Sequence, residues 1–218
     1  MTLFNSKTAI IIGNGDLQIL KNLNQYLNNE PYILVLDSAI TKIEKYITIT
    51  PNALLGDFDR NFDPTIWLNK FPSLEIIYTP DQEKTDFEKG IEYLIQLQFT
   101  HIIALGLTGK RMDHTFNNIS SLAKYNHLIE IEIIDKYSTI YCIDENNTFK
   151  KKFTQETILS LLPIGKVIGI STTNLLYNLN NEALELGIRT GSSNFVEANS
   201  EVSISIKKGK LIVMECID

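Results

Sequence analysis

The sequence has few of the residues that build zinc sites or disulfide-stapled domains. Its 218 residues include only two cysteines, Cys142 and Cys216, with no CxxC spacing and no histidine cluster near them. This argues against a zinc site and a disulfide framework and favours a reducing cytoplasm. No apolar run reaches the ~20 residues of a membrane span, and residues 1–7 lead straight into an expected core strand. We therefore expect neither export nor membrane insertion.

The sequence also lacks a dense stripe of lysine and arginine. The formal net charge is −6, and the run of lysines at 150–152 is short enough to be a solvated strand end. Because nucleic-acid surfaces depend on clustered cations, nucleic acid is not an expected partner. There is no internal repeat and no low-complexity linker. The length suits a medium domain joined closely to a smaller one.

The pattern of apolar and turn residues changes near residue 137. Before it, short β-branched runs alternate with longer amphipathic segments, which predicts an α/β domain over residues 1–137 with a mostly parallel sheet covered by helices. After it, short β-rich segments are separated by turn residues, which predicts an antiparallel β-domain over residues 138–218. The expected strands of the first domain are 8–12, 32–36, 53–55, 75–78, 101–105 and 129–134.

The expected strands of the second domain are 139–143, 148–153, 157–162, 167–171, 203–206 and 210–214. Pro163-Ile164-Gly165 is read as a turn between the third and fourth of these. In the first domain, apolar residues repeat at helical spacing from Phe87 to Ile95. Thr85 followed by Glu88 forms a possible capping box, which predicts that this helix begins beside Asp86.

Three acidic segments follow the apolar runs of the first domain. They are Gly56-Asp57-Phe58-Asp59, Asp81-Gln82 with Thr85-Asp86, and Arg111-Met112-Asp113-His114. A parallel sheet opens its ligand crevice at the carboxyl ends of its strands, so these segments are expected to meet in space. Carboxylates gathered there suit Mg²⁺ and polyphosphate. Taken singly, the first segment is better explained as a turn and the second as a helix cap.

The finer spacing sharpens these expectations. In an extended segment Asp57 and Asp59 share one face, and Lys89 can pair with Asp86 or reach a phosphate. The turn that begins at Gly106 leads from a strand into a helix, a geometry that binds phosphate, although it lacks the P-loop spacing. A structural or nucleotide-contacting role suits His114 better than that of general base.

The order of these motifs resembles that of the thiamine pyrophosphokinase family. Three motifs follow one another along the chain: Gly-Asp-Phe-Asp, Asp-Gln-x-x-Thr-Asp-x-x-Lys and Gly-x-x-Gly-x-Arg-x-Asp-His-x-x-x-Asn. The agreement with the family is weaker at Asn14-Gly15-Asp16 and Asp37. The resemblance runs from Gly56 to Asn194. In the second domain it is carried by Ser160-Leu161-Leu162-Pro163, Gly169, Leu175-Leu176-Tyr177-Asn178-Leu179 and Ser193-Asn194.

The resemblance implies a reaction and an assembly. Pyrophosphate would pass from ATP to the hydroxyethyl group of thiamine, giving thiamine diphosphate and AMP, with Mg²⁺ as the metal. Residues 1–137 would form the catalytic domain that binds ATP and Mg²⁺. Residues 138–218 would form a β-sandwich that binds thiamine and makes a homodimer, whose active sites lie between subunits.

The resemblance also assigns residues to roles. Asp57, Asp59, Asp86 and Asp113 would be catalytic and, together with Asp81, would hold metal. The expected ATP contacts are Thr85, Lys89, Arg111, His114 and Asn118. The expected thiamine contacts are Gln82, Tyr177, Ser193 and Asn194. Core packing explains Tyr177 equally well, and a simple turn is the alternative for Ser193-Asn194.

The chain departs from the family pattern at four places. Asp37-Ser38-Ala39 stands where glycines usually follow the aspartate, Lys110 and Asn174 replace common glycines, and Arg60 replaces a serine. Lys110 and Arg60 add positive charge near the expected phosphates. Two other functions stay open at this point: a non-catalytic sensor of thiamine or nucleotide, and a phosphohydrolase acting on nucleotides.

Overall fold

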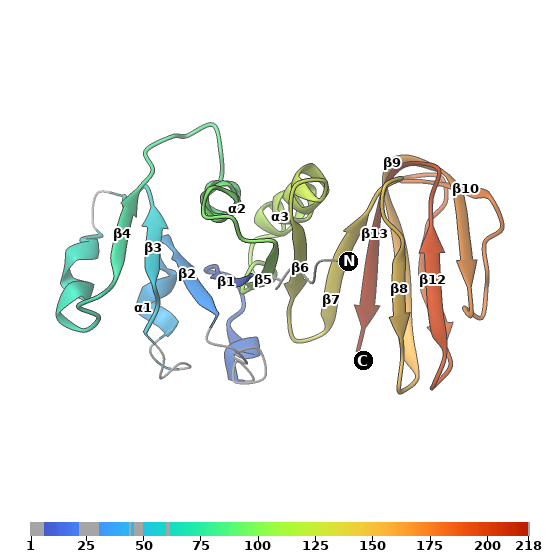
Figure 1. The fold of residues 1–218 in the computed structure, drawn as a ribbon, viewed down its shortest axis with the longest axis horizontal. Coiled ribbons are helices and arrows are strands. Elements are labelled where there is room, and N and C mark those ends of the chain that lie inside the picture. Colours follow the sequence, from blue (N-terminus) through green and yellow to red (C-terminus); the bar gives the residue numbers. More distant parts are fainter. Residues whose placement is uncertain (1–6, 22–30, 44, 46–49, 60–61, 218) are drawn as a thin grey trace. The chain divides into compact units, whose positions relative to one another are not determined.

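The computed structural model describes residues 7–21, 31–43, 45, 50–59 and 62–217 (Figure 1). Internal contacts divide the chain into two units. The first comprises Met1–Ser121 and Leu128–Lys136, and the second comprises Leu122–His127 and Tyr137–Asp218. Arg60, one of the departures noted above, lies outside the described residues.

The first unit is built on a parallel sheet with the strand order β4-β3-β2-β1-β5-β6. The central strands are apolar and almost fully buried; Ala9, Ile10, Ile11 and Ile12 of β1 have no exposed surface. This is the pattern of a strand covered on both faces. The strands are β1 (Thr8–Ile12), β2 (Tyr32–Leu36), β3 (Ala53–Gly56), β4 (Glu75–Tyr78), β5 (His101–Leu105) and β6 (Glu130–Ile134).

Few helices accompany this sheet among the described residues. They are α1 (Ile40–Ile43), α2 (Asp86–Gln96), α3 (Met112–Tyr125) and the 3₁₀ segments η2 (Asp37–Ala39) and η3 (Pro64–Asn69). Helix α2 lies close against the sheet at Gly90, where an added Cβ would stand 3.2 Å from Leu36 and 3.3 Å from Leu34. None of the helices described is long and apolar enough to span a bilayer.

The first turn of α2 contains the expected capping box. The hydroxyl of Thr85 accepts a hydrogen bond from the Glu88 N–H, and the Glu88 carboxylate accepts one from the Thr85 N–H. Two amides that have no partner within the helix are thereby satisfied. The sequence prediction of where α2 begins is confirmed.

Replacing Thr85 with alanine should lower the free energy of unfolding by about 1 kcal/mol, because the Glu88 N–H loses its acceptor. Denaturant titration of both proteins measures this difference. Thr154→Ala, at an exposed position of the second unit, is the control and should change stability by less than about 0.5 kcal/mol. Equal stability of the Thr85 variant and the parent would contradict a stabilising role of the cap.

The second unit is an antiparallel β structure organised around one long strand, β9 (Thr157–Thr173). Strand β9 pairs with four others, namely β10, β11, β12 and β13. Buried aliphatic residues, including Leu159, Leu161, Val202 and Val213, form its core. The other strands are β7 (Ser138–Ile143), β8 (Phe149–Lys152), β10 (Glu182–Glu185), β11 (Gly191–Val196), β12 (Glu201–Ser205) and β13 (Lys208–Cys216). The expected fold class, a parallel α/β part followed by an antiparallel β part, is confirmed.

The turn expected at Pro163-Ile164-Gly165 is wrong, because β9 continues through it. On the edge of β9 that pairs with β13, Pro163 lies opposite Leu211. On its other edge β11 pairs only with 157–161 and β10 only with 166–170, so Pro163 falls in the gap between them. A proline is tolerated in a strand where its missing N–H removes no ladder bond. Strands β10 and β11 were not predicted, and Ser193 and Asn194 lie within β11.

Candidate functional site

A cavity of about 530 Å³ lies in the first unit, at the carboxyl edge of its parallel sheet. Its walls come from the segments that follow β1, β2, β3 and β5 and from the first turn of α2. Since all six strands of this sheet run in the same direction, these chain segments emerge at one edge. The acidic segments predicted to converge there contribute unequally, because Asp57 and Asp86 line the cavity whereas Asp59, Asp81 and Asp113 do not.

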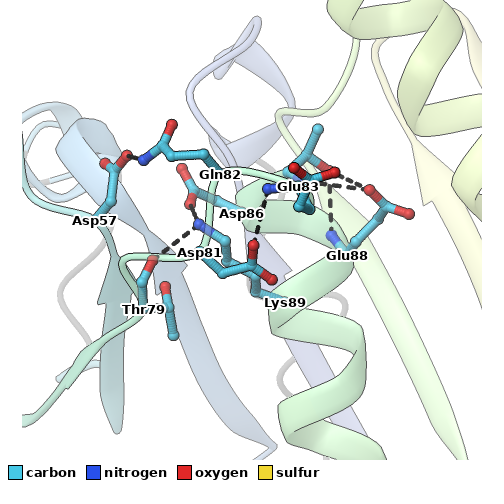
Figure 2. A network of polar contacts seen from close by, with 9 residues as sticks. Asp57, Thr79, Asp81, Gln82, Glu83, Asp86, Glu88 and Lys89 are labelled. Atoms are coloured by element: carbon cyan, nitrogen blue, oxygen red, sulfur yellow. Dashed lines mark hydrogen bonds and ion pairs between the residues drawn. The ribbon is translucent and has the colours of Figure 1, made fainter.

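Asp57 lines the cavity and Asp59 does not. Phe58 between them has a φ of 47°, so the segment is not extended and the two carboxylates do not share a face. The Asp57 Oδ2 atom accepts a 2.8 Å hydrogen bond from the Gln82 amide (Figure 2). Asp57 and Gln82 are therefore brought together, whereas Asp59 is exposed away from the cavity wall.

The residue that sequence reasoning left out of the site is Asp37. It follows β2 directly, lines the cavity, and has a φ of 43° in the left-handed region that non-glycine residues rarely adopt. Its buried Oδ1 atom has no hydrogen-bond partner. Gly56 gives it room, because an added Cβ there would stand 3.2 Å from this oxygen. The available signal was its position after a strand of the same sheet.

Asp86 stands in the first turn of α2, half-buried in the cavity wall. Burial raises the pKa of its carboxyl group, the positive charge of Lys89 opposes the shift, and the charges of Asp37 and Asp57 add to it. The Lys89 ammonium group is buried and donates to the Thr79 carbonyl at 2.9 Å and to Asp86 Oδ1 at 3.3 Å (Figure 2). Three carboxylates thus share one wall with a single buried lysine.

Asp81 lies outside this wall. It is exposed, and its Oδ1 atom accepts a 2.8 Å hydrogen bond from the Glu83 N–H in the turn before α2. Thr85 and Gln82 of the same segment do line the cavity. Four of the five residues that the sequence analysis assigned to the site in this segment line the cavity, namely Gln82, Thr85, Asp86 and Lys89. Asp81 does not.

The glycine-rich turn after β5 supplies the opposite wall. Gly106, Gly109 and Lys110 have φ angles of 66°, 77° and 56°. Arg111 and His114 line the cavity, but Asp113 is exposed and forms an ion pair with Arg111. Arg111 also donates hydrogen bonds to the Asp113 carboxylate, and these lower the pKa of Asp113 to about 2. Of the two, only the arginine faces the cavity.

Asn118 lines the same wall from α3 and is buried. Its amide donates a 2.7 Å hydrogen bond to the Leu107 carbonyl. The side chain therefore fixes the shape of the turn after β5. This contact leaves its oxygen and its second N–H for other partners.

The turn after β5 packs against the segment that follows β1. The Gly13 N–H donates to Leu105 O at 2.9 Å, and the Gly15 N–H donates to Gly106 O at 2.6 Å. The fit is tight, because a Cβ on Gly15 would stand 2.3 Å from the Thr108 carbonyl oxygen. These two backbone segments form one rim of the cavity.

In the second unit, the side chain of Asn194 makes three hydrogen bonds to backbone. Its Oδ1 accepts from the N–H groups of Tyr177 and Phe195 at 3.0 and 2.9 Å, and its Nδ2 donates to the Tyr177 carbonyl at 2.8 Å. Asn194 is 6% exposed, whereas Tyr177 is 69% exposed. Core packing is thus excluded for Tyr177, and Asn194 holds the backbone from which that ring projects. Ser193 in β11 donates its N–H to Ser160 Oγ at 2.9 Å.

The acidic wall was tested as a place for a divalent cation. Within the described part of the chain, no three His, Cys, Asp or Glu side chains form a ready-made metal cluster. Mg²⁺ does not need one, because it usually takes one or two carboxylates and completes its shell with water and phosphate oxygens. Asp57 and Asp86 on this wall, beside the unpaired buried oxygen of Asp37, are donors of the right kind. The residues fit the ion.

Comparison with known families gives two matches along the chain. Residues 23–134 match the family model described as thiamin pyrophosphokinase, catalytic domain. Residues 146–211 match the one described as thiamin pyrophosphokinase, vitamin B1 binding domain. The cavity described above is formed by residues of the first unit, and Tyr177 and Asn194 fall within the second match.

Individual relatives agree with these matches. The chain is 26% identical to thiamine pyrophosphokinase of Bacillus subtilis, covering 97% of this chain and all of that one. It is 25% identical to thiamin pyrophosphokinase 1 of Caenorhabditis elegans, covering 89% and 86%. Among solved structures, the Bacillus subtilis enzyme superposes with a TM-score of 0.85 at 24% identity, covering 97% of this chain and all of that one. The Candida albicans enzyme gives 0.84 at 17%, covering 98% and 90%.

Proposed function

The chain belongs to the thiamin pyrophosphokinase family, and from this premise we propose that it transfers the pyrophosphate group of ATP to the hydroxyl group of thiamine. The products are thiamine diphosphate and AMP. One observation carries the proposal for this particular chain: a single cavity is lined by carboxylates, with Lys89 among them, and by further cations on the turn after β5. That arrangement suits a polyphosphate accompanied by a divalent cation.

The cations and the carboxylates of the cavity have separate tasks in the reaction. Arg111 and Lys89 would screen the negative charge of ATP, so that the neutral hydroxyl of thiamine can approach the β-phosphorus. Attack at that atom releases AMP. The transfer depends mainly on positioning and electrostatics, and a carboxylate of the acidic wall that is not bound to metal would accept the proton of the hydroxyl group.

Asp57 and Asp86 would hold Mg²⁺ on the acidic wall, with Asp37 beside them. The ion would supply charge neutralisation at the phosphate oxygens. Asp59, Asp81 and Asp113 lie outside the cavity wall, and their roles as metal ligands or catalytic groups stay predictions. Thr85, His114 and Asn118 line the cavity and are proposed to contact ATP, and Gln82 to contact thiamine.

The second unit would contribute the rest of the thiamine site. Tyr177 presents a flat, exposed ring that can stack on the aromatic rings of thiamine. Asn194 would act through Tyr177, because it accepts from the Tyr177 N–H and donates to the Tyr177 carbonyl. Ser193, on the neighbouring position of β11, stays a proposed direct contact.

Replacing Tyr177 with alanine should raise the KM for thiamine about tenfold and leave the KM for ATP unchanged, because the stacking surface is lost. Asn194→Ala should have a similar effect by releasing the backbone of Tyr177. The double variant should then be no worse than Tyr177→Ala alone. Steady-state kinetics with each substrate varied in turn measures this.

Tyr137→Ala is the matched control, since Tyr137 is the other strongly exposed tyrosine of the second unit. It should leave both KM values unchanged. If Tyr177→Ala does the same, the ring is not part of the thiamine site. If the two changes at Tyr177 and Asn194 are additive, Asn194 acts by a separate route.

We also propose that the protein is a homodimer and acts in the cytoplasm. The second unit exposes the apolar side chains of Leu176, Leu186 and Ile188, which a second copy would cover. Cys142 and Cys216 are both free thiols, as expected of a reducing compartment. Light scattering coupled to size-exclusion chromatography tests the dimer, and a mass corresponding to one chain would contradict it.

The proposed reaction is tested by chromatography of products after the protein is mixed with thiamine, ATP and Mg²⁺. We expect AMP and thiamine diphosphate in equal amounts. ADP with thiamine monophosphate would show the wrong group being transferred. Binding of thiamine without AMP formation would favour a sensor, and phosphate release from ATP without thiamine would favour a phosphohydrolase.

A further inference from the structure

Two lysines from different parts of the first unit converge on one asparagine at the rim of the cavity. The ammonium group of Lys110 donates a 2.7 Å hydrogen bond to the Asn14 carbonyl, and that of Lys42 donates to Asn14 Oδ1. The Asn14 amide in turn donates to Ser38 Oγ at 2.8 Å. Lys42, Lys110 and Asn14 all line the cavity. Two positive charges are thereby fixed beside each other.

These two lysines differ from the other cations of the cavity wall. The ammonium hydrogen bonds of Lys42 and Lys110 that the structure describes go to uncharged oxygens of Asn14. Each remaining cation of the wall forms an ion pair with a carboxylate. These pairs are Lys84–Glu92, Lys89–Asp86 and Arg111–Asp113. Among the described residues, the positive charge at Asn14 therefore has no carboxylate in direct contact to balance it.

The charge at this rim is repulsive without an anion. Desolvation, followed by the nearby charge of Lys42, lowers the pKa of Lys110, and the charge of Asp16 opposes this shift. An anion between the two ammonium groups would remove the repulsion. Phosphate oxygens are suited to this, since they accept several charge-assisted hydrogen bonds at once.

The backbone at Lys110 favours glycine over lysine. Its φ of 56° lies in the left-handed region, directly after Gly109 at 77°. A residue with a Cβ is strained there, and glycine is not. Residues held in this sparsely populated backbone conformation cluster at ligand sites, and Lys110 lines the cavity.

We propose that Lys42 and Lys110, held by Asn14, form a phosphate subsite that binds the polyphosphate chain of the nucleotide. The identity of the nucleotide rests on the proposed function, whereas the anion-binding property rests on the geometry alone. Through the hydrogen bond from Asn14 to Ser38, the residue after Asp37, the subsite adjoins the acidic wall that would hold the metal. The proposal also assigns a function to Lys110, which is one of the four departures from the family pattern.

The test measures the binding of three probes by calorimetry in the presence of Mg²⁺: α,β-methylene-ATP, inorganic pyrophosphate and adenosine. Lys110→Gly and Lys42→Met should each weaken binding of α,β-methylene-ATP and pyrophosphate about tenfold, and leave adenosine unaffected. The affinity of the double variant for the nucleotide should also depend less steeply on salt. Lys45→Met, the same change of charge three residues from Lys42 and outside the cavity wall, is the control.

Thermal unfolding of Lys110→Gly separates this role from a structural one. If the lysine serves only to tie Asn14 in place, the variant should melt at a lower temperature and lose affinity for adenosine as well. If it serves as a phosphate ligand, relief of the strained backbone should leave the melting temperature equal or higher. Binding of α,β-methylene-ATP within twofold of the parent would overturn the subsite.

The product assay keeps this inference distinct from the proposed reaction. A parent protein that forms AMP from ATP and thiamine, together with lysine variants that bind the analogue normally, would refute the subsite only. A parent protein that forms no AMP, but whose pyrophosphate binding needs both lysines, would refute the reaction and leave the anion subsite standing.

Discussion

Replacing Asp86 with asparagine is expected to lower kcat at least about 100-fold while the protein stays folded. Asparagine keeps the shape of the side chain but removes the negative charge from the acidic wall. It also removes the carboxylate that accepts from Lys89, so the buried ammonium group loses its counter-charge. Product formation over time measures kcat, and thermal unfolding confirms that the variant is folded.

Glu83→Gln is the matched control for Asp86→Asn. It removes the same charge three residues earlier, at an exposed position outside the cavity wall. We expect its kcat to stay within about threefold of the parent, because exposed charges at a distance are largely screened by salt. An Asp86→Asn protein as active as the Glu83 variant would remove Asp86 from the catalytic site.

Replacing Gly15 with alanine is expected to lower the free energy of unfolding by about 3 kcal/mol and to abolish most of the activity. The new Cβ would stand 2.3 Å from the Thr108 carbonyl oxygen and 2.6 Å from that of Gly106. Both are backbone atoms, so a side-chain rotation cannot relieve the clash. The segment after β1 must move away from the turn after β5, and the rim of the cavity opens. Denaturant titration and the product assay measure the two effects.

Gly187→Ala separates steric clash from backbone strain. Gly187 has a φ of 84° and nothing within 4 Å of an added Cβ, so its replacement carries only the strain of the left-handed conformation, about 1 kcal/mol. Gly15 is the reverse case, a clash without a left-handed φ. If Gly15→Ala is no more destabilising than Gly187→Ala, the two segments are not packed as described.

The sequence predicted the first unit well because its local and long-range signals agree. Runs such as 8–12 and 101–105 are short, apolar and rich in isoleucine, which favours a buried strand, and their strands appear with the expected bounds. Thr85 and Glu88 located the start of α2 because a capping box acts within one turn. Patterns that depend on neighbouring residues alone can be read from the chain.

The missed features depend on which strands lie side by side. Pro163 signals a turn locally, and only the gap between β10 and β11 explains why β9 continues through it. Asp57 and Asp59 differ in position because Phe58 has a left-handed φ, which the sequence does not signal. Asp37 and Lys42 join the cavity through the strand order of the sheet. These outcomes are tertiary: the sequence marks Asp37 only by its position directly after a strand, and it carries no local sign of the others.

The strand order of the second unit has a consequence for synthesis of the protein. Strand β13 lies between β7 and β9 in the sheet, yet it leaves the ribosome after every other strand described. Until then β7 and β9 expose unpaired backbone edges, which invite pairing with other nascent chains. The second unit therefore completes folding only after translation has passed residue 216. In cells, this interval is when chaperone protection matters most.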